Sequence, residues 1–373
     1  MPDFGRIFAM KKHTLAWAAL CFSVLMLTGC ALFAQQSRSA AEEDTLALDP
    51  LTGEAARWPG QRPAAVFIDN GPEASRQWGI GEASVVFEAL TEGENATSLC
   101  LVYPSLEAVP KTGPVAQGRD LYLQLLACQQ VIPIQRGATV YAANFEDYYE
   151  VLPLDALSLG IKGFTYEGVW GQPDQISWTT SGADLLPLAD SAGVSLHVQP
   201  KTDPASADSD ASVGESTAKL PPLLPFGETA NGKEGASSVE LIFSPSSSTH
   251  FTYDEGTGQY LMARSDGSPQ TDANTSTQAG FDNLLILYSA PSLRDDGYCW
   301  GYDLTMGAGV YLNGGSVWSI LWMPGVDSTL AIYNSDGTAL NIHPGTSYIA
   351  LMGSVAGQEV ILRDSQGTEM TAN

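Results

Sequence analysis

The chain has 373 residues, of which 44% are hydrophobic, so it can bury the cores of about two ordinary domains and is not intrinsically disordered. Its 17 Lys and Arg residues against 42 Asp and Glu residues give a formal net charge of −25. Because a chain this acidic repels phosphate backbones, we expect no nucleic-acid partner.

The N-terminus has the pattern of a bacterial lipoprotein signal. A basic segment at residues 11–13 precedes an apolar run at 15–27, which is shorter than the roughly 20 residues that cross a bilayer core. The run ends in Leu-Thr-Gly followed by Cys30, whose thiol is the group that accepts a diacylglyceryl chain. We therefore predict a signal peptide over residues 1–29 and lipidation of Cys30. A short membrane anchor with an incidental cysteine is the alternative.

The mature chain is expected to begin with a flexible tether over residues 30–49, which is rich in small and polar residues and carries an acidic run. Anchored through its lipid, it would lie on the extracytoplasmic face of the cell membrane. Removal of residues 1–29 leaves a net charge of about −27, so the acidic excess belongs to the exported part. Translation could start at Met1 or at Met10.

Residues 50–200 mix strand and helix patterns, which predicts an α/β or α+β N-terminal domain. Apolar and β-branched runs predict strands over 64–68, 83–90, 97–103, 131–134 and 139–142. Near-helical spacing of Leu121, Leu125 and Leu126 predicts a helix over 118–129, and a weaker pattern predicts another over 145–157.

The periodicity disappears over residues 201–235, an acidic, Ser- and Pro-rich linker. Within it, the apolar segment 221–226 is expected to pack on a neighbouring domain. Residues 236–373 then alternate short strands with Gly-containing turns, which predicts a small, mainly antiparallel β domain. Its expected strands include 251–253, 260–262, 284–288, 317–323 and 330–333.

Three cysteines follow the anchor: Cys100, Cys128 and Cys299. They allow at most one intramolecular disulfide. Each lies in an apolar stretch, so we interpret them as small buried side chains, without settling whether two of them pair. No Cys or His cluster with metal-ligand spacing is present in the sequence, and no cofactor is expected.

Polar residues at strand ends form the best candidate binding site. The candidates are Asp69, Asn70, Glu88, Glu92, Arg119 and Asp120. Asp69 and Asn70 follow a predicted strand, where open α/β sheets present binding groups. Paired carboxylates such as Glu88 and Glu92 can act as acid and base. The structural alternative is a Glu88–Arg119 ion pair beside a turn formed by Asp69 and Asn70.

A set of short motifs in a fixed order resembles the YerB-like family of bacterial lipoproteins. The motifs fall at 50–53, 62–70, 87–90, 92–93, 113–115 and 119, and again at 251–254, 258–260, 272, 283, 307–309, 318, 336–337 and 344–345. The resemblance covers about residues 50–352 and implies a lipid-anchored envelope protein with two domains of uncharacterised function. It implies no reaction, cofactor or partner.

This chain departs from the family pattern where relatives carry basic residues. The resemblance implies Thr-Arg where this chain has Thr97 and Ser98, and Arg after Gly-Pro-Val where it has Ala116. A pattern of His and paired Gly is replaced at residues 135–138 by Gln-Arg-Gly-Ala. The chain is therefore expected to be a divergent member with altered binding.

Two classes of function remain. We favour an envelope lipoprotein that binds a small ligand or an envelope protein in the groove between its domains, because no nucleophile–base pair is visible in the sequence. The alternative is an envelope hydrolase that uses Glu88 and Glu92.

Overall fold

The structure is a computed structural model that describes residues 47–71, 74, 76–93, 96–168, 178–200, 218–229, 232–353 and 357–370. The predicted signal peptide, Cys30 and nearly all of the tether lie outside the described residues, as does the linker segment 201–217. Leu48–Asn373 forms one compact unit. Among the described residues, none of the helices is both long and apolar enough to cross a membrane.

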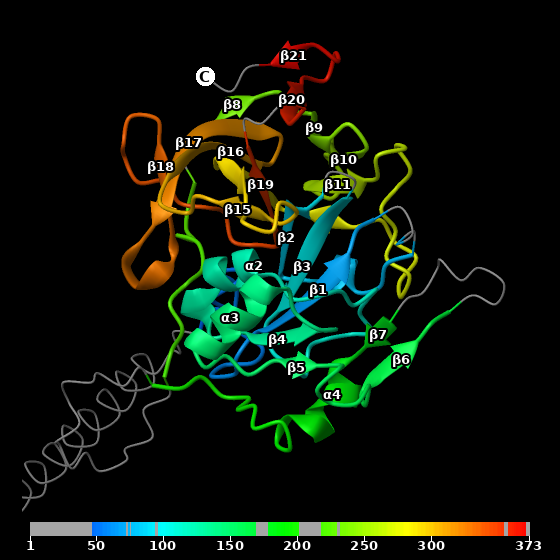
Figure 1. The fold of residues 1–373 in the computed structure, drawn as a ribbon. Helices are drawn as coiled ribbons and strands as arrows, with labels where there is room; N and C mark the ends of the chain where they lie inside the picture. The colour runs from blue at the N-terminus through cyan, green and yellow to red at the C-terminus, as the bar shows by residue number, and fades with distance from the viewer. Residues whose placement is uncertain are drawn as a thin grey trace, which may run out of the picture. The chain divides into compact units, whose positions relative to one another are not determined.

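An 11-stranded sheet runs through the middle of this unit (Figure 1). In spatial order its strands are β18 (Leu330–Asn334), β17 (Ser316–Pro324), β16 (Gly307–Asn313), β13 (Asn283–Tyr288), β19 (Ser347–Met352), β2 (Val85–Glu92), β3 (Ala96–Tyr103), β1 (Ala64–Asp69), β4 (Ile132–Gln135) and β5 (Leu154–Asp155), with β8 (Lys233–Glu234) paired to β17. The β13–β19, β19–β2, β1–β4 and β4–β5 pairs are parallel, and the other pairs are antiparallel. The parallel pair of β19 with β2 joins the two halves of the sequence into one sheet.

A second sheet of six strands is formed by the C-terminal half alone. Its order is β12 (Gly280–Phe281), β11 (Gln259–Ala263), β10 (Ser247–Asp254), β9 (Ser238–Ser244), β20 (Glu359–Arg363) and β21 (Glu369–Met370). Two short hairpins complete the strands, β6 (Phe164–Tyr166) with β7 (Trp178–Thr180) and β14 (Pro291–Leu293) with β15 (Trp300–Tyr302).

The central strands are buried on both faces, which explains their nearly continuous apolar runs. Along β1, Val66 belongs to one core cluster and Phe67 to the other, because successive side chains of a strand point to opposite faces. The Phe67 side packs against Tyr122 of α2 (Asp120–Leu125), which lies beside α3 (Val140–Tyr148) in Figure 1. The Val66 side contributes to the cluster that contains the second sheet and Leu185 of α4 (Gly182–Ala189).

The coarse prediction is confirmed: helices are few and intermixed with strands in the first half, and the second half consists mostly of strands. The structure differs from the picture of two independent domains, because β13 and β16–β19 extend the sheet of the first half. The apolar segment 221–226 packs as expected, with Leu223 and Leu224 fully buried.

The strand predicted over residues 139–142 is wrong. Thr139 is instead the N-cap of α3, and its side-chain oxygen accepts a hydrogen bond from the backbone N–H of Ala142 at 3.2 Å. A capping hydroxyl satisfies an otherwise unpaired N–H of the first turn, so the helix begins here rather than at residue 145. It ends at Tyr148 rather than at 157, because Glu150, directly after the C-cap residue Tyr149, has a left-handed conformation with a φ of 53° that does not continue a helix.

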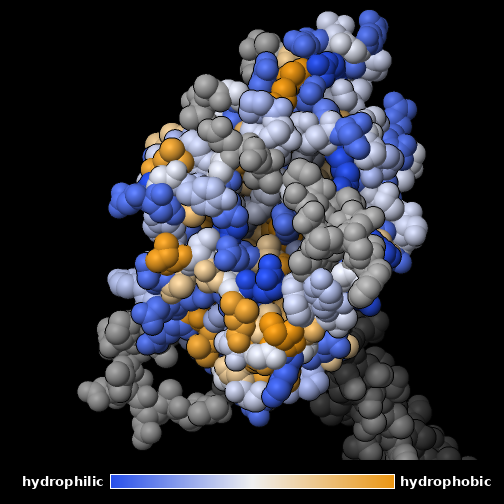
Figure 2. All heavy atoms as spheres, turned by 45° about the vertical axis from the view of Figure 1, so that its right-hand side comes forward, coloured by the Kyte–Doolittle hydropathy of each residue, from blue (hydrophilic) through white to orange (hydrophobic). Residues whose placement is uncertain are grey.

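Hydrophobic side chains on the surface are unevenly distributed. Figure 2 shows a face on which they gather below the centre, whereas hydrophilic side chains cover most of the remainder. Several large exposed ones belong to α3 or to the residues that follow it: Val140, Tyr148, Tyr149, Leu152 and Leu157. An exposed apolar patch such as the one in Figure 2 is typical of a binding surface.

Candidate functional site

Three strands of the main sheet end at the same edge. β1 and β2 both pair antiparallel with β3, and β4 pairs parallel with β1, so β1, β2 and β4 run in one direction. Asp69 ends β1, Glu92 ends β2, and Arg136 follows β4. Polar side chains of three strands therefore lie at this edge of the sheet.

These strand ends surround a polar cavity of about 310 Å³, which we call the strand-end pocket. Its lining residues are Asp69, Thr91, Glu92, Gly93, Thr97, Ser98, Pro114, Val115, Ala116, Gln117, Arg119, Arg136 and Tyr298. Three of the six predicted site residues, Asp69, Glu92 and Arg119, lie on its wall. Tyr298 comes from the other half of the sequence, next to the β14–β15 hairpin, and nothing in the sequence signalled its place here.

Arg119 is held rigidly in the wall of the pocket. Its Nη2 lies 2.6 Å from Oε1 of Glu92, its Nε donates to the Thr91 hydroxyl at 3.3 Å, and its Nη1 donates to the carbonyl of Gln117 at 3.2 Å. The Arg119 side chain is 7% exposed and that of Glu92 is 31% exposed. The ion pair of Arg119 is thus with Glu92, and not with Glu88 as the structural alternative proposed.

Glu88 lies in the core behind the pocket and is fully buried. Its carboxylate accepts hydrogen bonds from Asn70 Nδ2 at 3.0 Å, from Thr97 Oγ1 at 2.5 Å, from Thr249 Oγ1 at 3.0 Å and from the Tyr348 hydroxyl. Burial raises the pKa of Glu88 from its ordinary value, and these donors oppose the increase. A carboxylate so enclosed does not reach a substrate, which removes the geometric basis for a hydrolase that uses Glu88 with Glu92.

The Glu88 network instead fixes the residues that face outward. Asn70 bonds to both Glu88 and Thr97, and its Oδ1 accepts from Gln77 Nε2 at 2.9 Å. Asp69 accepts from the Gly71 backbone N–H at 2.9 Å, a turn-forming contact of the kind that the sequence suggested. Asn70 lines a neighbouring cavity of about 350 Å³ rather than the strand-end pocket.

Asp120 is not part of the pocket wall. Its Oδ2 lies 2.6 Å from Nη2 of Arg294, and the guanidinium of Arg294 lies 4.2 Å from the ring centroid of Tyr141. Asp120 therefore ties α2 to the second half of the chain, and we interpret it as structural.

The departures from the family pattern converge on one place. Ser98, Ala116 and Arg136 all line the strand-end pocket. Arg136 is exposed and, within the described residues, takes part in neither an ion pair nor a side-chain hydrogen bond; Asp69 likewise has no ion-pair partner there. Because Arg119 and Glu92 neutralise each other, the charges that the pocket presents to a ligand are the cation Arg136 and the anion Asp69.

The sequence also raised the questions of cysteine reactivity and metal binding. Cys100, Cys128 and Cys299 are buried, and in the part of the chain that the structure describes none of them forms a disulfide. Burial raises the pKa of the Cys299 thiol to about 11. The described residues contain no cluster of His, Cys, Asp and Glu side chains arranged to hold a metal ion.

Comparisons with known proteins agree with the architecture. The N-terminal and C-terminal domain models of a protein family of unknown function, DUF3048, match residues 51–166 and 239–349. The Bacillus subtilis (strain 168) protein named "Putative lipoprotein YerB" is 24% identical over 354 residues, which cover 92% of this chain and 96% of that protein. A crystal structure of YerB from Bacillus subtilis matches with a TM-score of 0.67 and 21% identity, over 84% of this chain and 99% of that one.

Proposed function

The chain belongs to the DUF3048 family of proteins of unknown function, and from this premise we propose that it is a lipid-anchored extracytoplasmic protein that binds a small zwitterionic ligand in the strand-end pocket. The proposed ligand class is a free amino acid or a short peptide with charged ends. The pairing of Arg119 with Glu92 carries this proposal, because it leaves Arg136 and Asp69 as the charges available to a ligand.

The anchor is supported by the sequence and by a relative. The run of Leu-Thr-Gly before Cys30 fits lipidation, and the name of the B. subtilis relative describes a lipoprotein. Replacement of Cys30 by Ser in the native host is expected to prevent lipidation and maturation, which mass spectrometry of the N-terminal peptide would detect. An N-terminal peptide of the native protein without acyl chains would overturn the anchor.

The ligand class follows from charge and size. A cavity of about 310 Å³ is at the lower end of the range for small-molecule sites, roughly 300–1,000 Å³. A ligand carboxylate can make two parallel hydrogen bonds to the planar guanidinium of Arg136, and a ligand ammonium can pair with Asp69. At the two positions where the resemblance implies arginine, this chain has the smaller residues Ser98 and Ala116. These small side chains leave room in the cavity for such a ligand.

Calorimetric titration of the mature chain with a panel of amino acids and dipeptides tests the proposal. At least one member is expected to bind saturably, and Arg136→Gln is expected to weaken that binding about tenfold or more. Arg57→Gln is the matched control, because Arg57 lies over the ring of Trp58 and does not line the pocket. Absence of binding across the panel, or equal loss in both variants, would contradict the proposal.

A further inference from the structure

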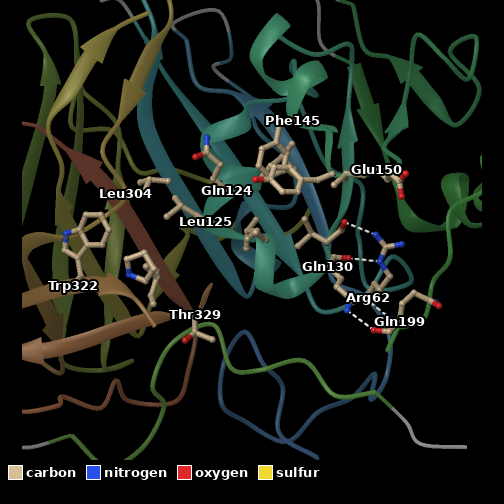
Figure 3. Close-up of a pocket in the computed structure, with 18 residues that line it drawn as sticks. Arg62, Gln124, Leu125, Gln130, Phe145, Glu150, Gln199, Leu304, Trp322 and Thr329 are labelled. Carbon is tan, nitrogen blue, oxygen red and sulfur yellow. Dashed lines mark hydrogen bonds between the residues drawn. The ribbon is translucent and has the colours of Figure 1, made fainter. Parts of the chain in front are cut away.

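A second and larger cavity lies on the helical side of the main sheet (Figure 3). It has a volume of about 720 Å³, and we call it the helix cleft. One wall comes from α2 and α3, with Leu125 and Phe145, and the other from β17 and β18, with Trp322 and Leu330. The cleft is therefore lined by both family regions, and none of the site residues predicted from the sequence lies on its wall.

The surface around the cleft is also apolar. Tyr149, which lines the cleft, is 60% exposed and packs edge-on against Tyr148, which is 79% exposed. Across the cleft, Val326 is 87% exposed in the turn between the lining residues Pro324 and Thr329. Apolar groups exposed on both sides favour an apolar occupant that continues out of the cleft.

Most polar side chains of the wall use their donors within the protein. Gln130 Nε2 donates to the carbonyl of Gln199 at 2.9 Å, Gln124 Nε2 donates to Asp120 at 2.9 Å, and the Thr329 hydroxyl donates to the carbonyl of Val326 at 3.1 Å. A peptide brings a carbonyl and usually an N–H with each residue, and these groups need partners when buried. The cleft therefore suits a hydrocarbon chain better than a peptide.

Arg62 supplies a positive charge on the wall of the cleft. Its guanidinium donates to three backbone carbonyls, of Gln130 at 2.6 Å, Ser195 at 2.8 Å and Val131 at 3.0 Å, as Figure 3 shows in part. Those carbonyls are neutral, and within the described residues no carboxylate forms an ion pair with Arg62. A guanidinium has five N–H donors, so two remain for a ligand.

We propose that the helix cleft binds a medium-chain fatty acid, with the acyl chain between Leu125 and Trp322 and the carboxylate at Arg62. This site is separate from the strand-end pocket and does not depend on the function proposed for that pocket. The carboxylate of Glu150, which also lines the cleft and is exposed, opposes the bound head group. Its presence predicts that removal of the Glu150 charge strengthens binding.

The test measures laurate binding to residues 30–373, produced without the signal peptide and with Cys30→Ser, so that the protein has no lipid of its own. Laurate is expected to displace a dansylated fatty acid probe saturably. Ala127→Phe is expected to weaken laurate binding at least tenfold, because exposed Ala127 lines the cleft and a ring there occupies it; Ala127→Ser is the matched control. Glu150→Gln is expected to increase laurate affinity about twofold to threefold, through reduced repulsion, and to leave dodecanol affinity unchanged.

The variants separate the two parts of the proposal. Arg62→Gln is expected to weaken laurate binding about tenfold and to change dodecanol binding little. Because Arg62 also holds three carbonyls, circular dichroism must first show that this variant folds; Glu150→Gln tests the head group independently. Failure of laurate to bind, or equal laurate binding by folded Ala127→Phe and the parent, would overturn the site. Equal responses of laurate and dodecanol to Glu150→Gln would overturn the carboxylate position.

Discussion

The hydroxyl of Tyr348 donates a hydrogen bond to the carboxylate of Glu88 in the core, although 260 residues separate them in the sequence. Glu88 lies on β2 and Tyr348 on β19, the parallel pair that joins the two halves of the chain. Thr249 of the second sheet donates to the same carboxylate. One buried acid therefore links the main sheet, the second sheet and the residues behind the strand-end pocket.

Removal of the Glu88 carboxylate should destabilise both halves together. Glu88→Leu leaves several buried donors without their acceptor, so we expect a loss of about 3 kcal/mol in the free energy of unfolding. Glu88→Gln retains one acceptor oxygen and should cost less, about 1–2 kcal/mol. Urea unfolding, monitored by tryptophan fluorescence and by circular dichroism, measures the free energy of unfolding of both variants. Separate transitions for the two halves, or no loss in Glu88→Leu, would show that the network does not join them.

Glu146 should make stability depend on pH near neutrality. Burial, together with the nearby charge of Asp155, raises its pKa to about 7 in the folded protein, against an ordinary value of 4.5. The folded state then holds a proton that the unfolded state releases, so this contribution to stability is complete below about pH 4.5 and is lost as the pH rises toward 7.

Glu146→Gln removes this titration. The variant is expected to gain stability relative to the parent between pH 5 and pH 8, on the order of 1 kcal/mol after partial solvation is allowed for. Urea unfolding at several pH values provides the comparison, with Glu107→Gln as the control. A stability difference between Glu146→Gln and the parent that does not change with pH would contradict the raised pKa.

The three buried cysteines should be unreactive thiols in the folded protein. Cys299 has a pKa raised to about 11 by burial and by Asp296, so little thiolate exists at pH 8, and burial also raises the pKa of Cys100. In the Cys30→Ser chain we expect slow reaction with a thiol reagent under native conditions and rapid reaction in denaturant. A disulfide found by mass spectrometry of the unreduced protein would contradict this arrangement.

The sequence predicted individual elements better than their assembly. Apolar runs located β1, β2 and β3 within a few residues, because both faces of these strands are buried. The pairing of β2 with β19 had no local signal, since it depends on segments far apart in the chain. The apolar and β-branched run over 139–142 also predicted the wrong structure, because the capping hydroxyl of Thr139 starts a helix there.

The candidate site was predicted in part for the same reason. Of the six candidates, Asp69 and Glu92 at strand ends and Arg119 at the start of α2 line one pocket. Glu88 was placed among them because its burial against Thr249 and Tyr348 is a tertiary property that the local sequence does not show. Arg136 was noticed as a departure from the family pattern, and only the fold places it beside Asp69 on the pocket wall.

The most direct test of the proposed ligand class pairs each ligand charge with one protein charge. Calorimetry would compare the best-binding amino acid with its carboxamide and with the analogue that lacks the amino group, in the parent, Arg136→Gln and Asp69→Asn proteins. We expect the parent to prefer the amino acid over both analogues by about tenfold or more. Arg136→Gln should lose the preference for the amino acid over its carboxamide and keep the preference over the deaminated analogue. Asp69→Asn should lose the preference over the deaminated analogue and keep the preference over the carboxamide. Unchanged discrimination in both variants would contradict binding in the strand-end pocket.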